Sequence, residues 1–491
     1  MIEDLINESS YAGWGTAALV ICESVIRFLF VFVLLGQKRT SSEARIAWIL
    51  MILVFPLFGW VLYLLVGRAT LGKSRIDLHR VVRDEVAASN CHPGLDPELS
   101  AMLELPLPQR QIASVAERVS GSEPLRGNTA TLFGNTDVIV NSIIEDINQS
   151  VDHCHLIFYI WLDDQSGTKV GEALMRAKAR GVNARVLVDS VGSKRFLNSN
   201  LCHRMRESGV EIVGALPVSP IRALFHRIDL RNHRKIVVID GMIAWTGSQN
   251  MADAAFALKP KFAPWIDCAI RLVGPAAKEL QILFLEDWYL DTDELIKEEL
   301  QRPCIAESHG VLAQVVASGP NYQSSAATEL VQACIQIASE EITFTTPYFV
   351  PDSATIINLT VAAHRGVKVD IVVPKHNDSR LVALASRANY LALLEAGVHI
   401  HEFEGGLLHA KTISIDRDTA LITSANLDRR SFNLNFEAGV LVFDTDFASQ
   451  LRFLQQGYID RSKQVDFKEW VKRGSIHRIL ENTAGLMSPL L

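Results

Sequence analysis

The sequence lacks the excess of basic residues that polyanion-binding proteins usually show: 48 Lys and Arg stand against 55 Asp and Glu, for a net charge of −7. This balance disfavours nucleic acid as a partner, although it leaves room for a local basic patch. Cys-x-x-Cys pairs are also lacking, and the seven cysteines are an odd number. They predict reduced thiols and argue against a disulfide framework or a zinc knuckle. The first ten residues are acidic, which argues against a cleaved signal peptide.

What the sequence does contain is an internal repeat of the pattern His-x-Lys, four residues, Asp, seven residues, Ser-x-Asn. The first copy consists of His233, Lys235, Asp240, Ser248 and Asn250. Each of these residues recurs at one offset, 409 − 233 = 176, in a second copy that consists of His409, Lys411, Asp416, Ser424 and Asn426. Five polar matches at a single offset are not a coincidence, so the chain contains an internal repeat.

Each copy predicts a strand, a turn and a second strand, because residues 235–239 and 411–415 are rich in β-branched side chains. Side chains alternate across a strand, so the His and the Lys project from one face, and the hairpin returns the Ser and the Asn to the same end. An imidazole, a cation and hydrogen-bond donors suit a phosphate group. Two imidazoles facing each other would supply both an attacking group and an acid for the leaving oxygen.

The stretches 233–240 and 409–416 resemble the paired motifs of the phospholipase D superfamily. Residues 246–250 and 424–437 resemble the bacterial cardiolipin synthases within it, and the resemblance covers nearly the whole chain. It implies a phosphatidyltransferase that moves a phosphatidyl group between two phosphatidylglycerol molecules, releases glycerol and forms a phosphohistidine. It also implies that His233 is the nucleophile and His409 the acid, whereas the residues alone leave the two interchangeable. No cofactor or metal is expected, because two histidines and two lysines make one unnecessary.

The predicted site has three groups of residues. The catalytic set is His233, Lys235, Asp240, His409, Lys411 and Asp416, with the two aspartates expected to fix strands and turns. The substrate-binding set is Ser248, Asn250, Ser424 and Asn426, of which the asparagines, with the lysines, are expected to stabilise the charged phosphorus. Asp267 and Glu437 follow the motifs and are interpreted either as carboxylates that orient a histidine or as ordinary turn residues. In the second copy Arg417 and Thr423 stand where glycines are usual in the family, which puts the loop geometry in doubt.

Two long apolar runs precede these motifs. Residues 14–35 are interrupted only by Glu23 and Arg27, and residues 46–66 carry no charge. Each would span about 30 Å as a helix, which matches the hydrocarbon core of a bilayer. Three basic residues between the runs and five after the second favour a cytoplasmic catalytic part. The sequence thus predicts two transmembrane helices, and the resemblance implies a multi-pass protein of the bacterial inner membrane whose partners are phospholipids and the lipid bilayer.

Strands alternate with helices in the same order in both halves, which predicts α/β layers around mixed sheets. The expected fold is a pair of phospholipase D-like α/β/α repeats related by a pseudo-two-fold axis, with two sheets side by side and the site on the seam. The predicted parts are a membrane region at 1–68, a connector at 69–125, and repeats at 126–305 and 306–491.

Three alternatives stay open at this point, and so does the oligomeric state. The chain could be a hydrolytic phospholipase D, a phosphatidyltransferase that uses another acceptor alcohol, or a membrane-bound scaffold without activity. The complete motifs argue against the scaffold.

Overall fold

The computed structural model describes residues 21–37, 42–63, 67, 73–89, 91–218, 229–256, 258–300, 304–322 and 326–487. The chain divides into two compact units. The larger unit consists of residues 74–217 and 230–491 and holds both motifs, while residues 1–73 with 218–229 form the smaller unit.

The larger unit is built on one mixed sheet, in which the described residues form sixteen strands. In the first half these are β1 (Leu125–Phe133), β2 (His153–Phe158), β3 (Asn183–Asp189), β4 (Glu211–Ala215), β5 (Arg231–Asn232), β6 (Ile236–Ile239), β7 (Ile243–Gly247) and β9 (Ala269–Val273). In the second half they are β10 (Val311–Ser318), β11 (Glu341–Thr345), β13 (Lys368–Pro374), β14 (His399–Phe403), β16 (Thr412–Ile415), β17 (Thr419–Thr423), β19 (Asn435–Phe443) and β20 (Ser462–Gln464).

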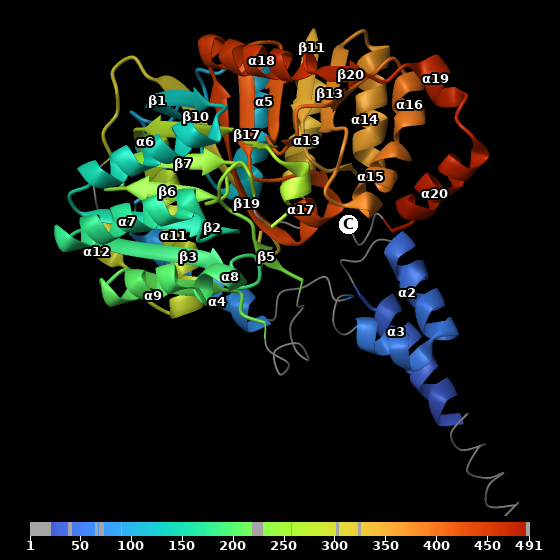
Figure 1. Cartoon of the computed structure of the whole chain (residues 1–491), viewed down its shortest axis with the longest axis horizontal. Helices are drawn as coiled ribbons and strands as arrows, with labels where there is room; N and C mark the ends of the chain where they lie inside the picture. The colour runs from blue at the N-terminus through green and yellow to red at the C-terminus, as the bar shows by residue number, and fades with distance from the viewer. Residues whose placement is uncertain are drawn as a thin grey trace, which may run out of the picture. The chain divides into compact units, whose positions relative to one another are not determined.

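The two halves of the sheet repeat one strand order (Figure 1). The strand order in the first half is β4-β3-β2-β6-β7-β9-β1, and that in the second half is β14-β13-β11-β16-β17-β19-β10. Strand β20 pairs with β14 and extends the second half beyond the repeated order. The repeat predicted from the motifs is therefore confirmed at the level of topology.

The expectation of two separate sheets is wrong, because β1 pairs on both of its edges. Leu125 and Asn128 pair antiparallel with Ala313 and Val311 of β10, and residues 129–133 of β1 pair antiparallel with β9. The two halves are thus joined into a continuous sheet.

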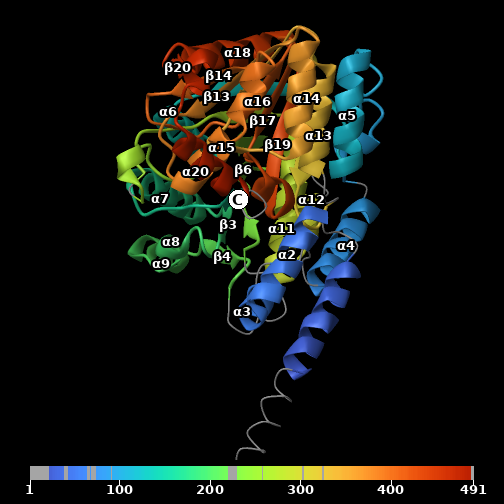
Figure 2. The same ribbon diagram turned by 90° about the vertical axis from the view of Figure 1, so that its right-hand side faces the viewer.

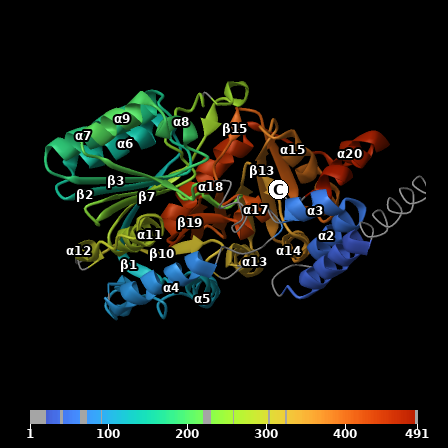
Figure 3. The same ribbon diagram turned by 90° about the horizontal axis from the view of Figure 1, so that it is seen from below.

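Helices cover both faces of each half of this sheet. In the first half they are α6 (Thr136–Gln149), α7 (Gln165–Ala179), α8 (Lys194–Leu197), α9 (Asn200–Glu207), α11 (Pro275–Thr292) and α12 (Lys297–Leu300). In the second half they are α13 (Ala326–Ile337), α14 (Ser353–His364), α15 (Arg380–Arg387), α16 (Tyr390–Glu395), α17 (Arg429–Asn433), α18 (Thr445–Ile459), α19 (Phe467–Val471) and α20 (Ser475–Gly485). Strands β2, β3 and β7 lie between α7 and α9 on one side and α11 on the other (Figure 3). Two earlier helices, α4 (Lys73–Ala88) and α5 (Leu107–Ser120), lead into the sheet, and α5 packs against α13 (Figure 2).

Local sequence explains where several of these helices begin. Asn135, Asp164, Asp352 and Asp444 each accept a hydrogen bond from a backbone N–H in the first turn of the following helix. Such caps satisfy donors that have no partner within the helix.

Helix α11 is buried almost all round, with every residue from Pro275 to Trp288 in the interior. It contacts strands of both halves, so it forms a shared core beneath the sheet.

The smaller unit contains a helix at residues 21–35, followed by α2 (Ser42–Val54) and α3 (Pro56–Leu62). The second apolar run is therefore not one straight helix. The chain folds back at Phe55, so that the rings of Trp48 and Tyr63 lie 5.3 Å apart. No helix among the described residues combines the length and the apolar character that a membrane crossing requires. The two predicted transmembrane runs extend outside the described residues, at 14–20 and 64–66.

Candidate active site

The two motif histidines are positioned by very short strands that cross between the repeats. His233 follows β5, which pairs in parallel with the start of β19 in the second repeat, and its N–H donates to the Phe436 carbonyl at 2.9 Å. His409 follows β15 (Leu407–Leu408), which pairs with β8 (Trp265–Ile266) of the first repeat, and its N–H donates to the Ile266 carbonyl at 2.8 Å. Each histidine is thus anchored to the opposite repeat.

The same crossing gives each imidazole a carboxylate. Nδ1 of His233 lies 2.9 Å from both oxygens of Glu437. Nδ1 of His409 lies 2.6 Å from Asp267 Oδ1. A carboxylate that accepts from Nδ1–H fixes the tautomer, so that Nε2 carries the lone pair. Both imidazoles can therefore attack phosphorus or exchange a proton through Nε2, and the contacts of Asp267 and Glu437 are those expected of carboxylates that orient a histidine.

Ser248 and Ser424 hold these carboxylates. The Ser248 hydroxyl donates to Asp267 at 2.6 Å, and the Ser424 hydroxyl donates to Glu437 at 2.5 Å. Each oxygen also accepts a backbone N–H, from Cys268 and Ala438 respectively. The prediction that the serines bind the substrate is not what this geometry indicates, because each hydroxyl proton is already used. The serines position the carboxylates that position the histidines.

The two motif lysines are buried, and the charge of Lys411 lowers the pKa of Lys235. Lys235 Nζ donates to the carbonyl of His233 at 2.6 Å, and Lys411 Nζ donates to that of His409 at 2.7 Å. Burial lowers the pKa of Lys235 to about 7 and that of Lys411 to about 8, and for Lys235 the charge of the other lysine adds to the effect. Burial likewise lowers the pKa of each motif histidine to about 4. The site therefore resists positive charge, and a bound anion would relieve this.

The motif asparagines differ in how they are engaged. Asn250 Oδ1 accepts from the Ile160 N–H at 3.2 Å. Asn426 is only 6% exposed, and its Oδ1 has no hydrogen-bond partner within the described part of the chain. A buried polar atom without a partner is costly, so this amide is suited to a ligand group.

Sequence reasoning did not find two residues that lie close to the imidazoles or to their carboxylates. The Trp265 ring lies 4.6 Å from that of His409. Arg234, which is 1% exposed, donates through Nη1 to Asp287 at 2.5 Å and through Nε to the Glu437 carbonyl at 3.2 Å. The available signal was its position: Arg234 lies between His233 and Lys235, so its side chain points away from theirs.

Comparisons with known proteins agree with this geometry. Residues 143–288 and 331–454 match a family described as "Cardiolipin synthase, PLD-like domain", and residues 25–68 match one described as "Phospholipase_D-nuclease N-terminal". Cardiolipin synthase A of Proteus mirabilis is 37% identical over 487 residues, which cover 95% of this chain and 98% of the relative. That of Serratia proteamaculans is also 37% identical, over 93% of this chain and 94% of the relative.

The chain belongs to the cardiolipin synthase family. A solved structure of phosphatidylserine synthase from Haemophilus influenzae has the same fold, with a TM-score of 0.56 at 14% identity over 78% of this chain and 100% of that one.

In this cardiolipin synthase family member, the motif aspartates serve the backbone. Asp240 accepts from the N–H groups of Val151, Asp152 and His153 at 2.8–3.0 Å. Asp416 accepts in the same way from residues 339–341. Each aspartate directly follows its motif strand, at the end of the strand that is farther from the histidine. These contacts agree with the expectation that the two aspartates fix strands and turns.

The turn after each aspartate shows how the synthase tolerates its unusual second motif. Asp240 and Gly241 have φ of 54° and 69°, and Asp416 and Arg417 have 46° and 60°. Arg417 thus adopts the left-handed conformation that glycine adopts in the first copy, and its Nε donates to Glu341 at 2.6 Å. The loop keeps its shape despite the substitution, at the cost of a conformation that side chains disfavour.

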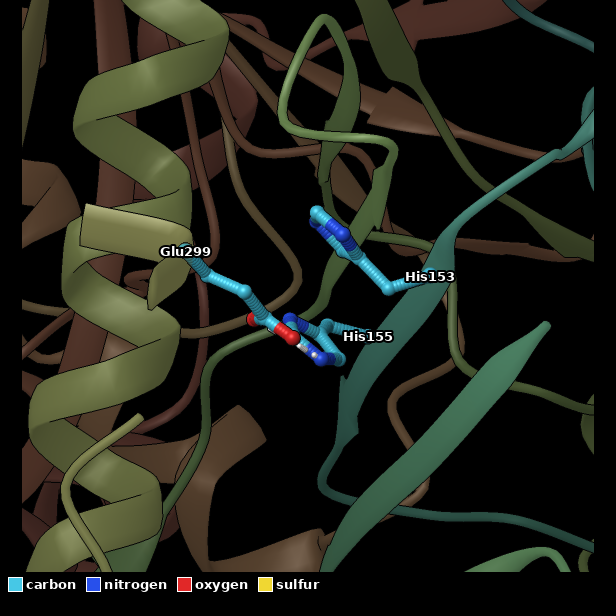
Figure 4. A group of neighbouring side chains, drawn as sticks. All are labelled: His153, His155 and Glu299. Atoms are coloured by element: carbon cyan, nitrogen blue, oxygen red, sulfur yellow. Dashed lines mark ion pairs between the residues drawn. The ribbon is translucent and has the colours of Figure 1, made fainter. Parts of the chain in front are cut away.

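Among the described residues, a second histidine group lies outside this site (Figure 4). His153, His155 and Glu299 are close enough together to hold a metal ion. However, Gln281 bonds one nitrogen of each histidine, at 3.0 and 2.8 Å, and Arg185 Nη1 lies 3.3 Å from His155 Nε2 and 3.1 Å from Glu299. A fixed cation in contact with two of the three residues opposes a metal ion, so this group fits a buried hydrogen-bonded network instead.

Proposed function

We propose that this chain is a cardiolipin synthase that transfers a phosphatidyl group from one phosphatidylglycerol to another, with release of glycerol. The single observation that carries the proposal is the reciprocal pairing of His233 with Glu437 and of His409 with Asp267, each across the two repeats. This pairing supports a site in which two oriented imidazoles act on one phosphate. The names of the relatives, which are cardiolipin synthases, support the choice of lipid.

The first step forms a phosphohistidine. Nε2 of His233 attacks the phosphorus of phosphatidylglycerol, and the bond to the glycerol oxygen breaks. The bound phosphate and Asp267 stabilise the positive charge of protonated His409, which gives its Nε2 proton to the leaving oxygen, and glycerol departs. Glu437 stabilises the positive charge that forms on His233 during the attack, as a carboxylate does behind a catalytic histidine.

The second step forms the product. A glycerol hydroxyl of a second phosphatidylglycerol attacks the phosphohistidine, and neutral His409 takes its proton. The phosphorus–nitrogen bond breaks, His233 is restored, and cardiolipin leaves. One phosphodiester replaces another, so no nucleotide is needed. Lys235, Lys411 and Asn426 stabilise the charge on the phosphate oxygens in both steps.

We further propose that the enzyme is held in the bacterial inner membrane by its two apolar segments, with the catalytic unit on the cytoplasmic side. Large apolar side chains in the smaller unit support the first point, because Phe28, Phe32, Leu57 and Phe58 are each more than 60% exposed. Apolar surface of this extent on a soluble protein would be unusual. The excess of basic residues after the second segment supports the orientation.

Phosphatidylglycerol alone tests the proposed reaction. We expect the purified full chain in detergent micelles to form cardiolipin and glycerol in equal amounts, and the His233→Ala variant to form neither. Phosphatidic acid in place of cardiolipin would instead identify a hydrolase. After rapid denaturation in alkali, without any exposure to acid, we expect peptide mapping to recover the phosphate on His233. Phosphate on His409 would reverse the assigned roles.

A further inference from the structure

Helix α20, the last helix of the larger unit, carries its apolar side chains on its outer face. Ile476 is 73% exposed and Ile479 is 63% exposed. Leu480 is exposed as well, and so are Leu486 and Met487, which directly follow the helix. These five positions recur at spacings of three, four and seven residues, so they form one apolar strip. A surface helix normally directs such a strip towards the core, whereas α20 directs it away from the protein.

A different face of α20 packs against the protein. Ala484 is 4% exposed and belongs to a core cluster with Val382 and Ala385 of α15. Glu481 is also 4% exposed, and both terminal nitrogens of Arg473 donate to its carboxylate, at 2.7 and 2.8 Å. A buried carboxylate needs such a partner. The inner face thus consists of a small side chain and a paired carboxylate, and these contacts keep the apolar strip on the outside.

The contact face of α20 adjoins residues that lead to the candidate active site. Tyr348 packs against the cluster that contains Ala484, and its hydroxyl donates to Asp378 at 2.8 Å. The negative charge of Asp378 acts in turn on Lys411, the motif lysine of the second repeat. Helix α20 therefore lies beside the part of the larger unit that holds the phosphate-binding groups.

The segment that contains α20 is basic, although the chain as a whole is acidic. Residues 461–491 contain six Lys and Arg and three Asp and Glu, which gives 6 − 3 = +3. The whole chain has a net charge of −7, so the remaining residues carry −7 − 3 = −10. Lys468 and Lys472 of α19 and Arg478 of α20 are exposed. Apolar side chains on one face of a helix, with basic side chains around them, are typical of helices that bind the interface of an anionic membrane.

We propose that the apolar strip of α20 inserts into the surface of an anionic lipid bilayer, with the neighbouring basic side chains among the headgroups. This contact belongs to the catalytic unit itself and adds to the two N-terminal apolar segments. The inference rests on the proposed function in one respect, because phosphatidylglycerol is an anionic lipid that reaches the site from such a surface. Insertion of α20 brings the phosphate-binding groups close to the headgroups on which they act.

Photolabelling from the lipid phase tests this contact without turnover. The full chain is reconstituted in vesicles of phosphatidylglycerol and phosphatidylcholine that contain a trace of phosphatidylcholine with a diazirine on one acyl chain. After irradiation, we expect mass spectrometry to find the label on residues 476–487 and on residues 21–35 of the first apolar run. In vesicles of phosphatidylcholine alone, labelling of α20 should fall several-fold, while labelling of residues 21–35 persists.

The decisive variant places charge on the apolar strip. In Ile476→Glu/Ile479→Glu we expect labelling of α20 to fall roughly tenfold, because carboxylates oppose insertion among anionic lipids. The matched control is Phe453→Glu in α18, which replaces a side chain that is 82% exposed at the opposite edge of the larger unit (Figure 1). It should keep the labelling of the wild type. Thermal unfolding shows whether each variant folds, and Ile479→Gln is the milder replacement if the double variant does not.

Each outcome supports or overturns the contact. A wild-type chain with an unlabelled α20 would overturn it, because the apolar strip would then be covered by the smaller unit or by a second copy of the chain. Equal labelling in phosphatidylcholine alone, a double variant that keeps the label, or a Phe453→Glu variant that loses it would do the same. If α20 is labelled as expected but no cardiolipin forms, the proposed reaction fails while the membrane contact stands.

Discussion

Glu437 accepts from the imidazole of His233 across the boundary between the two repeats, with both carboxylate oxygens 2.9 Å from Nδ1. The relationship is reciprocal, because Asp267 of the first repeat accepts from His409 of the second. A positive charge that develops on either imidazole is therefore stabilised by a carboxylate of the opposite repeat.

Removing the charge of Glu437 should slow the chemical step. In Glu437→Gln the side chain keeps its shape, but it no longer stabilises an imidazolium and no longer selects the Nδ1–H tautomer. We expect kcat to fall roughly 10²- to 10⁴-fold with a small change in KM. Initial rates of cardiolipin formation measure this. Glu404→Gln, at an exposed residue paired with Lys375, is the control and should behave as wild type.

Ser424 should act through Glu437 and not on the substrate. Removal of its hydroxyl in Ser424→Ala loosens the carboxylate, and we expect roughly a tenfold loss of kcat. A double-mutant cycle distinguishes the two roles, since residues in one hydrogen-bonded chain are not additive. Adding Ser424→Ala to Glu437→Gln should cost little more; a full further tenfold loss would mean that the serine contacts the lipid directly.

Asp240 should affect stability more than chemistry. Asp240→Ala leaves three backbone N–H groups without their acceptor, and it places alanine at φ of 54°. We expect the free energy of unfolding to fall by roughly 2–4 kcal/mol, because hydrogen bonds to a charged acceptor are lost. Asp240→Asn, which retains one acceptor and tolerates this backbone conformation, should lose less. Thermal unfolding measures the effect, and kcat per folded molecule should stay within about threefold of wild type.

Anion binding should weaken as pH rises through about 7 and 8, the pKa values of Lys235 and Lys411. The protonated lysines attract a phosphodiester, and a bound anion raises their pKa values, so binding takes up protons. By linkage the affinity falls with increasing pH, by up to about tenfold per pH unit for each lysine. Calorimetry with dihexyl phosphate in buffers of different ionisation enthalpy measures both quantities.

Two variants locate the source of this pH dependence. Lys235→Met should remove the lower of the two steps, because its ammonium group titrates first. Lys463→Met, at an exposed residue of β20, should retain both steps. An affinity that does not change between pH 6 and pH 9 would contradict the assignment of the lysines as phosphate ligands.

Chelators should leave phosphatidyl transfer unchanged. Two lysines and two histidines supply the positive charge and the proton transfer that a metal ion supplies in other phosphoryl-transfer sites. We therefore expect the same rate of cardiolipin formation before and after dialysis against EDTA. A loss of rate that is restored by a divalent cation would show that a metal ion takes part.

The polar part of the site could be predicted from the sequence because it follows the repeat. One offset of 176 placed the histidines, lysines, serines and asparagines, and strand alternation put each His and Lys together. The carboxylates fall outside that offset, since 437 − 267 = 170, and their exchange between repeats depends on the pairings of β5 with β19 and of β8 with β15. Two-residue strands have no periodicity that a sequence could reveal.

Other differences have equally local causes. A carboxylate that accepts three backbone N–H groups and one that takes part in catalysis look alike in sequence, so Asp240 and Asp416 could not be distinguished from active groups by spacing alone. The continuous sheet results from β1, which pairs through different residues with β10 and β9. The second apolar run has the length of a membrane span, but Pro56 begins a new helix there and Phe55 turns the chain.

The exchanged carboxylates also limit how such a protein can be divided. A fragment ending before β10 would keep His233 but lose Glu437, and the complementary fragment would keep His409 but lose Asp267. Neither piece would have a counter-ion behind its imidazole. A polypeptide with only one of these halves would have to associate with a copy of itself to give each imidazole a carboxylate. In this chain the two halves belong to one polypeptide, so they remain associated.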